Sequence, residues 1–530
     1  PIPAADVAGW RHDLQQLVRE LERKHPAPYN RTPRDTFTAA VARLEQRIPQ
    51  LAAHEIIVEL QRLVALVGDG HTNINLTAAA GVDFHQLPIR FGMYPDGVFV
   101  EAGDIAYRNA VGGRVVAIDD TPIDTVLARI RPLLSRDNDQ WFPVATPQLM
   151  NLVEVLHALR IAKDLEDVTL RIERAGRTAD VVIKPLAQTR PRAFGYPFRA
   201  QYTSTWLDAR DAAGGEPPLY QQRTGDVYWW QYVAKDRLLY IKWDEVQNRA
   251  QGETALQMFR TALAYAREHA SEIDKVLLDI RNNIGGEGGL LDPIVREIVR
   301  TREVDEPGRF FVAIGPRTFS AALLLSSALE RYARPIFVGE PTGGKVNVYA
   351  GHVFATLGFS GIGVSISPAL YQTSFPNDAR AYVTPRLYVR PTFADYLANR
   401  DPVYEAVVAY KPPTYAQDVE RLVLAGDTVG AASLLRRHAA DPVNTFNGAA
   451  PLINAAGYRQ LRAGNAEVAL RLFRLNVRVH PDYTNGWDSL GEAYAETGRR
   501  AEAIAAFEEV LRREPGNGRA RELLERLRRS

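Results

Sequence analysis

A period of 34 residues runs through the last part of the chain. Identical residues recur at this spacing in four pairs: Gly457 and Gly491, Gly464 and Gly498, Phe473 and Phe507, Pro481 and Pro515. The surrounding sequence is rich in Ala, Arg and Leu, which form helices readily. A period of this length predicts two helices per repeat, stacked so that neighbouring repeats bury one continuous apolar core.

The repeat carries a more specific signature. Trp487-Asp-Ser-Leu490-Gly491-Glu-Ala-Tyr494 resembles the tetratricopeptide pattern at all four of its positions. We expect an all-α domain of tetratricopeptide repeats over 413–530. Such repeats are binding surfaces rather than sites of chemistry, so the tail is predicted to recruit a partner protein or to mediate self-association.

A second stretch points to chemistry. Residues 309–325, Arg-Phe-Phe-Val-Ala-Ile-Gly-Pro-Arg-Thr-Phe-Ser-Ala-Ala-Leu-Leu-Leu, have the pattern of an apolar strand, a Gly-Pro turn and a helix that opens at Ser320. A hydroxyl there lies beside unsatisfied helix N–H groups. This suits a nucleophile, because the donors stabilise the charge that forms when Ser320 attacks a carbonyl. The alternative is a helix N-cap, for which Ser is a preferred residue.

Length and composition exclude several classes of function. A chain of 530 residues is too long for one core, which predicts roughly three or four domains. The 64 Lys and Arg balance 63 Asp and Glu, so no basic face favours a nucleic-acid or anionic-membrane partner. The absence of Cys excludes disulfides, a thiol nucleophile and iron–sulfur clusters. No apolar run approaches the ~20 residues of a membrane span.

The chain begins at Pro1 rather than Met. This favours prior removal of a leader, and with it a periplasmic or secreted location, while a cytoplasmic one stays open.

Patterning divides the rest of the chain into four parts. Apolar residues at helical spacing between Ala5 and Leu66 predict three helices, in an N-terminal helical bundle over 1–80. Short strands with a helical insertion follow over 81–190. Residues 191–235 have little period and are assigned to a connection. Strands and helices then alternate over 236–412, which predicts an α/β core of at least four strands, with a site at the carboxyl ends of the strands.

The strand region has a recognisable centre. Gly112-Gly-Arg-Val-Val-Ala-Ile-Asp-Asp-Thr-Pro122 resembles the middle of a PDZ domain, a module that adds a peptide as an extra strand to its sheet. The resemblance implies that a PDZ-like domain over 81–190 helps to hold a peptide substrate.

Four motifs follow one another along the chain: Gly68-Asp-Gly-His71-Thr72, Asp279-Ile-Arg-Asn-Asn-Ile-Gly-Gly286, Thr318-Phe-Ser-Ala-Ala322 and Gly339-Glu-Pro-Thr-Gly-Gly-Lys345. Together they resemble the C-terminal-processing, or tail-specific, serine protease family, including its tricorn-like and interphotoreceptor-retinoid-binding-protein-like branches. The resemblance covers about residues 5 to 410. It implies a crotonase-like α/β core with a PDZ-like domain and an N-terminal helical part.

The resemblance also implies roles for residues. Ser320 would be the nucleophile, and the N–H groups of Gly286 and Ala321 the oxyanion donors. Branches that use histidine make His71 the general base, with Asp378 as the orienting acid, although tricorn-like enzymes have Glu there. Branches that use lysine make Lys345 the base. We favour His71, because Lys345 would need burial to lower its pKa from about 10.4, and we assign Lys345 to positioning substrate or Ser320.

Two partial motifs are rejected. Gly339 to Lys345 begins like a nucleotide-binding loop, but Val346 stands where a Ser or Thr should bind magnesium. His54-Glu55 begins like a zinc-protease helix, but Val58 replaces the second His.

The sequence therefore predicts a serine endopeptidase that hydrolyses proteins or peptides through an acyl-enzyme at Ser320, without a metal or organic cofactor. The alternative is a non-catalytic binding protein on the same fold, which holds a small apolar ligand or a peptide.

Overall fold

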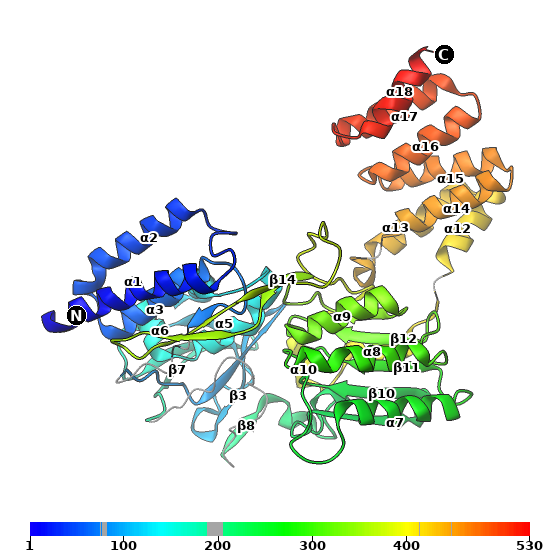
Figure 1. The fold of residues 1–530 in the computed structure, drawn as a ribbon. Helices are drawn as coiled ribbons and strands as arrows, with labels where there is room; N and C mark the ends of the chain where they lie inside the picture. Colours follow the sequence, from blue (N-terminus) through cyan, green and yellow to red (C-terminus); the bar gives the residue numbers. More distant parts are fainter. Residues whose placement is uncertain (75, 77–81, 188–204, 413, 447, 530) are drawn as a thin grey trace. The chain divides into compact units, whose positions relative to one another are not determined.

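The computed structural model describes residues 1–74, 76, 82–187, 205–412, 414–446 and 448–529. The chain divides into two compact units (Figure 1). The first comprises Pro1–Pro385 with Val389–Val408, and the second comprises Ala409–Ser530 with Arg386–Tyr388. None of the helices in the described parts of the chain combines the length and the apolar character needed to cross a bilayer.

The first unit begins with the three helices that the apolar spacing predicted, which are confirmed. They are α1 (Val7–Lys24), α2 (Arg34–Arg47) and α3 (Ala53–Ala65). Leu14 and Leu17 of α1 and Ile57 and Leu60 of α3 are fully buried in one core. The helix α3 ends directly before the loop that carries His71, so the packed bundle fixes where that loop starts.

A mixed sheet with a helical insertion follows, and it includes one strand beyond the predicted range 81–190. Its strands lie in the order β2-β3-β4-β6-β7, with β5 paired to β4 and β8 to β3. The strand bounds are β2 (Ile89–Tyr94), β3 (Gly97–Asp104), β4 (Arg114–Ile118), β5 (Thr121–Pro122), β6 (Val168–Arg174), β7 (Arg177–Ile183) and β8 (Trp206–Asp208). The helices are α4 (Ile123–Ile130), α5 (Phe142–Met150) and α6 (Val153–Ala158). The PDZ-like identity of this sheet stays a prediction.

The connection expected over 191–235 needs correction. Its first part, 191–204, lies outside the described residues, but β8 joins the mixed sheet and β9 (Tyr228–Val233) joins the α/β core. The run Tyr-Trp-Trp-Gln-Tyr-Val is aromatic and ends in Val, and such residues favour strands. The Pro- and Gly-containing sequence before it hid this signal.

The predicted α/β core is confirmed. Its strands follow the order β13-β12-β11-β10-β9, in which β10 to β13 are parallel and β9 is antiparallel to β10. One face of this sheet packs on α7, α8 and α9 in a shared apolar core. The bounds are β10 (Leu238–Trp243), α7 (Ala255–Glu268), β11 (Lys275–Asp279), α8 (Leu291–Arg300), β12 (Phe310–Ile314), α9 (Ala321–Tyr332) and β13 (Ile336–Gly339). The name crotonase-like stays a prediction.

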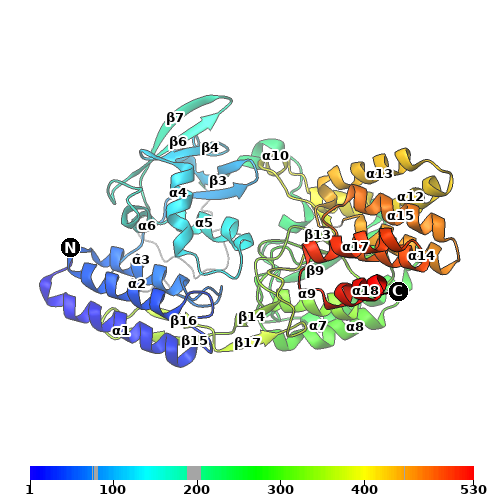
Figure 2. The same cartoon turned by 90° about the horizontal axis from the view of Figure 1, so that it is seen from above.

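Two further pairs of strands carry the chain from the core to the helical bundle. β14 (Asn347–Ala350) pairs with β17 (Ala369–Gln372), and β15 (Val353–Thr356) pairs with β16 (Gly363–Ile366). On its other edge β16 pairs with β1 (Asn73–Ile74), which directly follows the His71 loop. Figure 2 shows β15 and β16 beside α1, and their apolar residues share the core of the bundle. The last helices of the first unit are α10 (Phe393–Leu397) and α11 (Pro402–Ala409), whose final residue is assigned to the second unit.

The second unit is helical, as the 34-residue period predicted. Its elements are β18 (Leu387–Tyr388), α12 (Tyr415–Leu424), α13 (Thr428–Ala440), α14 (Ala450–Arg462), α15 (Ala466–Val479), α16 (Thr484–Glu496), α17 (Arg500–Arg513) and α18 (Gly518–Arg529). The repeated glycines have a packing role. A Cβ on Gly457 would lie 2.4 Å from the ring of Phe473, and one on Gly491 would lie 2.9 Å from Phe507. The repeated Gly and Phe are therefore contact partners within each helix pair.

Candidate active site

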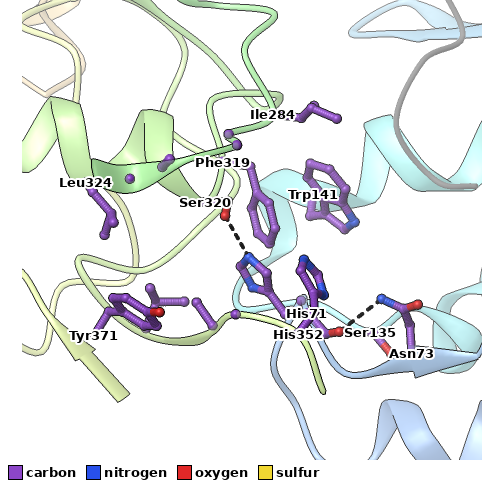
Figure 3. Close-up of a pocket in the computed structure, with 18 of the residues that line it drawn as sticks. His71, Asn73, Ser135, Trp141, Ile284, Phe319, Ser320, Leu324, His352 and Tyr371 are labelled. Atoms are coloured by element: carbon purple, nitrogen blue, oxygen red, sulfur yellow. Dashed lines mark hydrogen bonds between the residues drawn. The ribbon is translucent and has the colours of Figure 1, made fainter. Parts of the chain in front are cut away.

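Ser320 stands at the turn between β12 and α9. Its backbone has φ 52° and ψ −125°, a region that costs a non-glycine residue about 1–3 kcal/mol. The residue occupies the N-cap position of α9, but its side chain makes no capping hydrogen bond. Instead, Oγ lies 2.9 Å from Nε2 of His71 (Figure 3). The N-cap alternative therefore describes the backbone position of Ser320 but not the use of its hydroxyl.

The buried carboxylate of Asp69 fixes the backbone of the loop that carries His71. Oδ1 of Asp69 accepts hydrogen bonds from the backbone N–H groups of His71 (2.8 Å) and Thr72 (2.7 Å) and from the hydroxyl of Ser367 (2.8 Å). Oδ2 of Asp69 lies 3.0 Å from Nε2 of His25. Burial alone would raise the pKa of Asp69, but the hydrogen bonds from His25, Ser367 and Thr72 lower it. Asp69 thus stays ionised and fixes the backbone of the loop.

The imidazole of His71 is buried, with 2% of the residue exposed. Burial lowers the pKa of His71 to about 4; the Asp69 carboxylate opposes this shift and His352 adds to it. Nδ1 of His71 is also buried and has no hydrogen-bond partner of good geometry. The backbone of Tyr349 lies near enough to raise the pKa without completing such a bond. At neutral pH the ring is uncharged, so Nε2 can accept the proton of Ser320.

The loop of Gly285 and Gly286, which carries one predicted oxyanion donor, packs directly against Ser320 and Ala321. The carbonyl of Gly285 accepts from the N–H of Val246 at 2.8 Å. In a trans peptide the carbonyl and the N–H point in opposite directions, so the N–H of Gly286 points away from Val246. A Cβ on Gly285 would lie 2.4 Å from Cβ of Ser320 and 2.8 Å from the nitrogen of Ala321. Ala321 opens α9, where an N–H has no partner within the helix.

The remaining residues of the glycine loop hold its shape. The side chain of Asn283 donates to the carbonyl of Trp243 (2.9 Å) and accepts from the N–H of Gly285 (2.9 Å). The carbonyl of Asn283 accepts from the N–H of Phe319 at 3.1 Å. The side chain of Asn283 therefore holds the glycine loop, and its backbone carbonyl connects that loop to the loop of Ser320. Sequence reasoning gave Asn283 no role, although its place in the motif was the available signal.

Arg281, two residues after the end of β11, is held by two carboxylates at the start of the same loop. Its guanidinium donates to both carboxylate oxygens of Asp401 at 2.8 and 3.0 Å. Its Nε donates to Asp279 at 3.0 Å, and Tyr240 donates to the second oxygen of Asp279 at 2.8 Å. Arg281 and both carboxylates are buried. Nothing in the sequence motif indicated that its charge is balanced by Asp401, 120 residues away.

Lys345 and Asp378 do not join the Ser320–His71 pair. Among the described residues, His71 is the side chain to which the hydroxyl of Ser320 is hydrogen-bonded. Lys345 is half-buried in the loop between β13 and β14, and its charge acts on Asp137. Asp378 pairs with Arg380 at 2.8 Å. The pKa of Asp378 is lowered chiefly by that hydrogen bond. No contact within the described residues supports Asp378 as the acid that orients His71.

Asp137 is a functional candidate that the sequence did not reveal. It is fully enclosed, and burial, reinforced by the Asp69 charge, raises its pKa to about 8. Oδ1 accepts a long hydrogen bond of 3.4 Å from the N–H of Gly70, and Oδ2 has no partner. Burial therefore favours the protonated form of Asp137, which contacts Gly70 of the loop that carries His71.

A pocket of about 720 Å³ opens beside Ser320. Figure 3 shows Ser320, His71 and His352 at its centre, with Trp141, Leu324 and Tyr371 around them. Most of the larger lining side chains are apolar: Leu133, Leu134, Trp141, Ile284, Phe319, Leu324, Val348 and Tyr371. No group of three or more His, Asp or Glu suited to a metal ion occurs in the described part of the chain.

Comparison with known proteins bears first on the tail. A tetratricopeptide-repeat model matches residues 484–517. A stretch of 72 residues is 35% identical to tetratricopeptide repeat domain-containing protein PYG7, chloroplastic, of Arabidopsis thaliana, and covers 14% of this chain and 24% of that protein. The chain thus spans about a quarter of this relative's length. The match confirms the predicted repeat, a type of structure suited to protein interaction.

Solved structures bear on the first unit. Mature CPAF complexed with lactacystin is 13% identical over 76% of this chain and 98% of that chain, with a TM-score of 0.53. A mutant of CPAF is 12% identical over 77% of this chain and 99% of that chain, with a TM-score of 0.54. This chain shares the CPAF fold. The likeness extends over nearly the whole CPAF chain, and at this identity it concerns the fold alone.

The photosystem II D1 C-terminal processing protease is 14% identical over 72% of this chain and 93% of that chain. Its TM-score of 0.34 is below the level at which a shared fold follows. The comparisons therefore show a fold shared with CPAF and a tetratricopeptide repeat in the tail.

Proposed function

We propose that this chain is a serine endopeptidase whose nucleophile is Ser320 and whose general base is His71. The observation that carries the proposal is the 2.9 Å contact between Oγ of Ser320 and Nε2 of an uncharged, buried His71. It is the arrangement that an activated serine requires. The strained backbone of Ser320 supports the proposal, since strain of this kind gathers at functional sites.

The chemistry follows from the geometry. As Oγ attacks the scissile carbonyl, Nε2 of His71 takes the hydroxyl proton. The oxygen of the tetrahedral intermediate becomes negative and is held by the N–H groups of Gly286 and Ala321, each worth roughly 3 kcal/mol of barrier. The protonated His71 then gives its proton to the leaving amine. Water, deprotonated by His71, hydrolyses the acyl-enzyme at Ser320 and restores the free hydroxyl.

The substrate would be a protein or peptide, held partly by the mixed sheet over 81–190. The tetratricopeptide tail would bind a partner protein or a second copy of the chain. A binding protein for a small apolar ligand or peptide is the second candidate, favoured by the apolar lining of the pocket.

Turnover of an unstructured protein by the wild type and by Ser320→Ala tests the proposal. We expect loss of turnover in Ser320→Ala. The matched control is Ser326→Ala on the same helix, because the buried hydroxyl of Ser326 bonds only the carbonyl of Ala322 at 2.9 Å. Turnover that survives Ser320→Ala, or no turnover by the folded wild type, would reject the peptidase and leave the binding protein.

A further inference from the structure

We propose that Phe319 is the positioning residue for His71, and that its ring takes the place of a hydrogen-bonded carboxylate in fixing the imidazole toward Ser320. The inference rests on the proposed function where it treats His71 as the base. The contact itself and its test by titration do not depend on that function.

The rings form a continuous stack. The centroids of Phe319 and His71 are 4.6 Å apart with 21° between their planes. On the other side of Phe319, Trp141 lies 4.6 Å away at 29°. Figure 3 shows the ring of Phe319 between those of Trp141 and His71. Because Phe319 directly precedes the nucleophile, the residue that supports the imidazole moves with the hydroxyl that the imidazole faces.

Glycines of two motifs make room for this stack. A Cβ on Gly70 would lie 2.5 Å from Cζ of Phe319, and one on Gly344 would lie 3.3 Å from Cδ2 of the same ring. A Cβ on Gly343 would lie 2.9 Å from Cε3 of Trp141 and 2.1 Å from a backbone oxygen. The loops that carry His71 and Lys345 thus both carry glycine where the rings pass. These contacts give the glycines a physical reason other than turn formation.

No carboxylate is hydrogen-bonded to the ring of His71 in the described structure, and the backbone of Tyr349 approaches the ring without a bond of good geometry at Nδ1. Oδ1 of Asp69 is used by two backbone N–H groups and Ser367, and Oδ2 by His25. The ionisable groups that act on the ring are Asp69 of its own loop and His352, whose ring centroid is 5.4 Å away. Among these contacts the stack on Phe319, at 4.6 Å and 21°, is the one that lies flat against a face of the ring and so restricts its plane.

The same contact keeps water from one face of the imidazole. Burial is the main cause of the low pKa of His71, about 4 instead of 6.5. A smaller side chain at position 319 would admit water to that face. The imidazolium would then be better solvated, and the pKa would rise toward its ordinary value.

The experiment is an NMR titration of the His71 ring in the full chain, with its signal identified by loss in His71→Gln. We expect a pKa near 4 in the wild type and a clear rise toward 6.5 in both Phe319→Leu and Trp141→Leu. Trp141→Phe keeps an aromatic ring behind Phe319 and should stay near the wild type. Phe37→Leu removes a buried aromatic ring that packs on Tyr29 in the helical bundle, so it controls for general destabilisation and should not move the pKa.

An unchanged His71 pKa in folded Phe319→Leu would overturn the inference. Activity gives a second readout: Phe319→Leu should lower kcat/KM by about 10²-fold, the effect of a misplaced catalytic group, with its acid limb shifted upward. If kcat/KM falls only as much as the fraction of folded protein falls, and the acid limb of the pH profile does not move, that result would also count against the inference. If wild-type turnover proves independent of Ser320, the proposed function fails, while the titration still decides the role of Phe319.

Discussion

Oγ of Ser320 and Nε2 of His71 lie 2.9 Å apart although the two residues are 249 positions apart in the chain. Two features bring them together. The strand β1, directly after the His71 loop, pairs with β16 of the segment that follows β13, and the carboxylate of Asp69 holds both the His71 loop and Ser367. The loop that follows the N-terminal bundle therefore supplies His71, and the α/β core supplies Ser320.

Substitution of the two candidate bases, His71 and Lys345, should reduce kcat/KM to clearly different extents. His71→Ala removes the group that accepts the proton, so kcat/KM should fall by roughly 10²–10⁴-fold. Lys345→Ala should keep measurable turnover, because no hydrogen bond joins Lys345 to Ser320 in the described structure, where His71 is the partner of the hydroxyl. Circular dichroism checks that both variants fold. The opposite ranking would assign the reaction to a Ser/Lys pair.

The acid limb of kcat/KM should lie unusually low. A His base works only when uncharged, so activity falls as the pH drops through its folded-state pKa. Burial lowers that pKa in His71 to about 4, and the limb should be centred there rather than near 6.5. A pH series on the wild type measures it, with the folded fraction followed in parallel. A midpoint near 6.5 in fully folded protein would mean that the imidazole is hydrated.

Asp137 should make stability depend on pH. Its folded pKa, about 8, exceeds the ordinary value of 3.8, so the folded state holds this proton more tightly than the unfolded state. Stability from this group is complete below about pH 4 and is lost as the pH rises through 8. The Asp137→Asn variant has no ionisable group at this position, so it does not lose this stability as the pH rises. Urea unfolding at about pH 5 and about pH 8 should show the variant gaining on the wild type at the higher pH. A gap that stays constant or reverses would contradict the buried, protonated carboxyl.

Removing Asp401 should destabilise the core. Asp401→Ala removes one of the two carboxylates that balance the buried charge of Arg281. Breaking a buried ion pair in this way should lower the free energy of unfolding by about 3–5 kcal/mol. Glu405→Ala is the matched control, since Glu405 forms an exposed pair with Arg400, worth about 1 kcal/mol or less. Urea unfolding of both variants gives the comparison. Equal and small losses would show that the Arg281–Asp401 pair contributes little.

Local signals were sufficient for much of the fold. The spacing of apolar residues predicted the three N-terminal helices, the alternation of strands and helices predicted the α/β core, and the 34-residue period predicted the tail. Each depends on residues close together in the sequence. The strand β9 was missed because Tyr228–Val233 follows a Pro- and Gly-containing segment whose lack of period dominated the interpretation.

A feature of the site could be predicted from the sequence only where one motif contains all the residues that form it. Ser320 at its strand–helix turn and the glycines at 285 and 286 are of this kind. The partner of Arg281 is not, because Asp401 lies 120 residues away, outside the motif that contains Arg281. The stack on His71 requires three loops to meet, so no single motif indicates it. Asp378 matched by position, but the described structure pairs it with Arg380 and leaves its catalytic role a prediction.

Covalent labelling of Ser320 tests the central claim most directly. A fluorophosphonate reacts with a serine only when a base and oxyanion donors activate it. Peptide mass spectrometry of the labelled chain should find the adduct on Ser320, with labelling much slower in His71→Ala and nearly unchanged in Lys345→Ala. An adduct on another residue with Ser320 unmodified, in protein shown to hydrolyse peptides, would contradict the account.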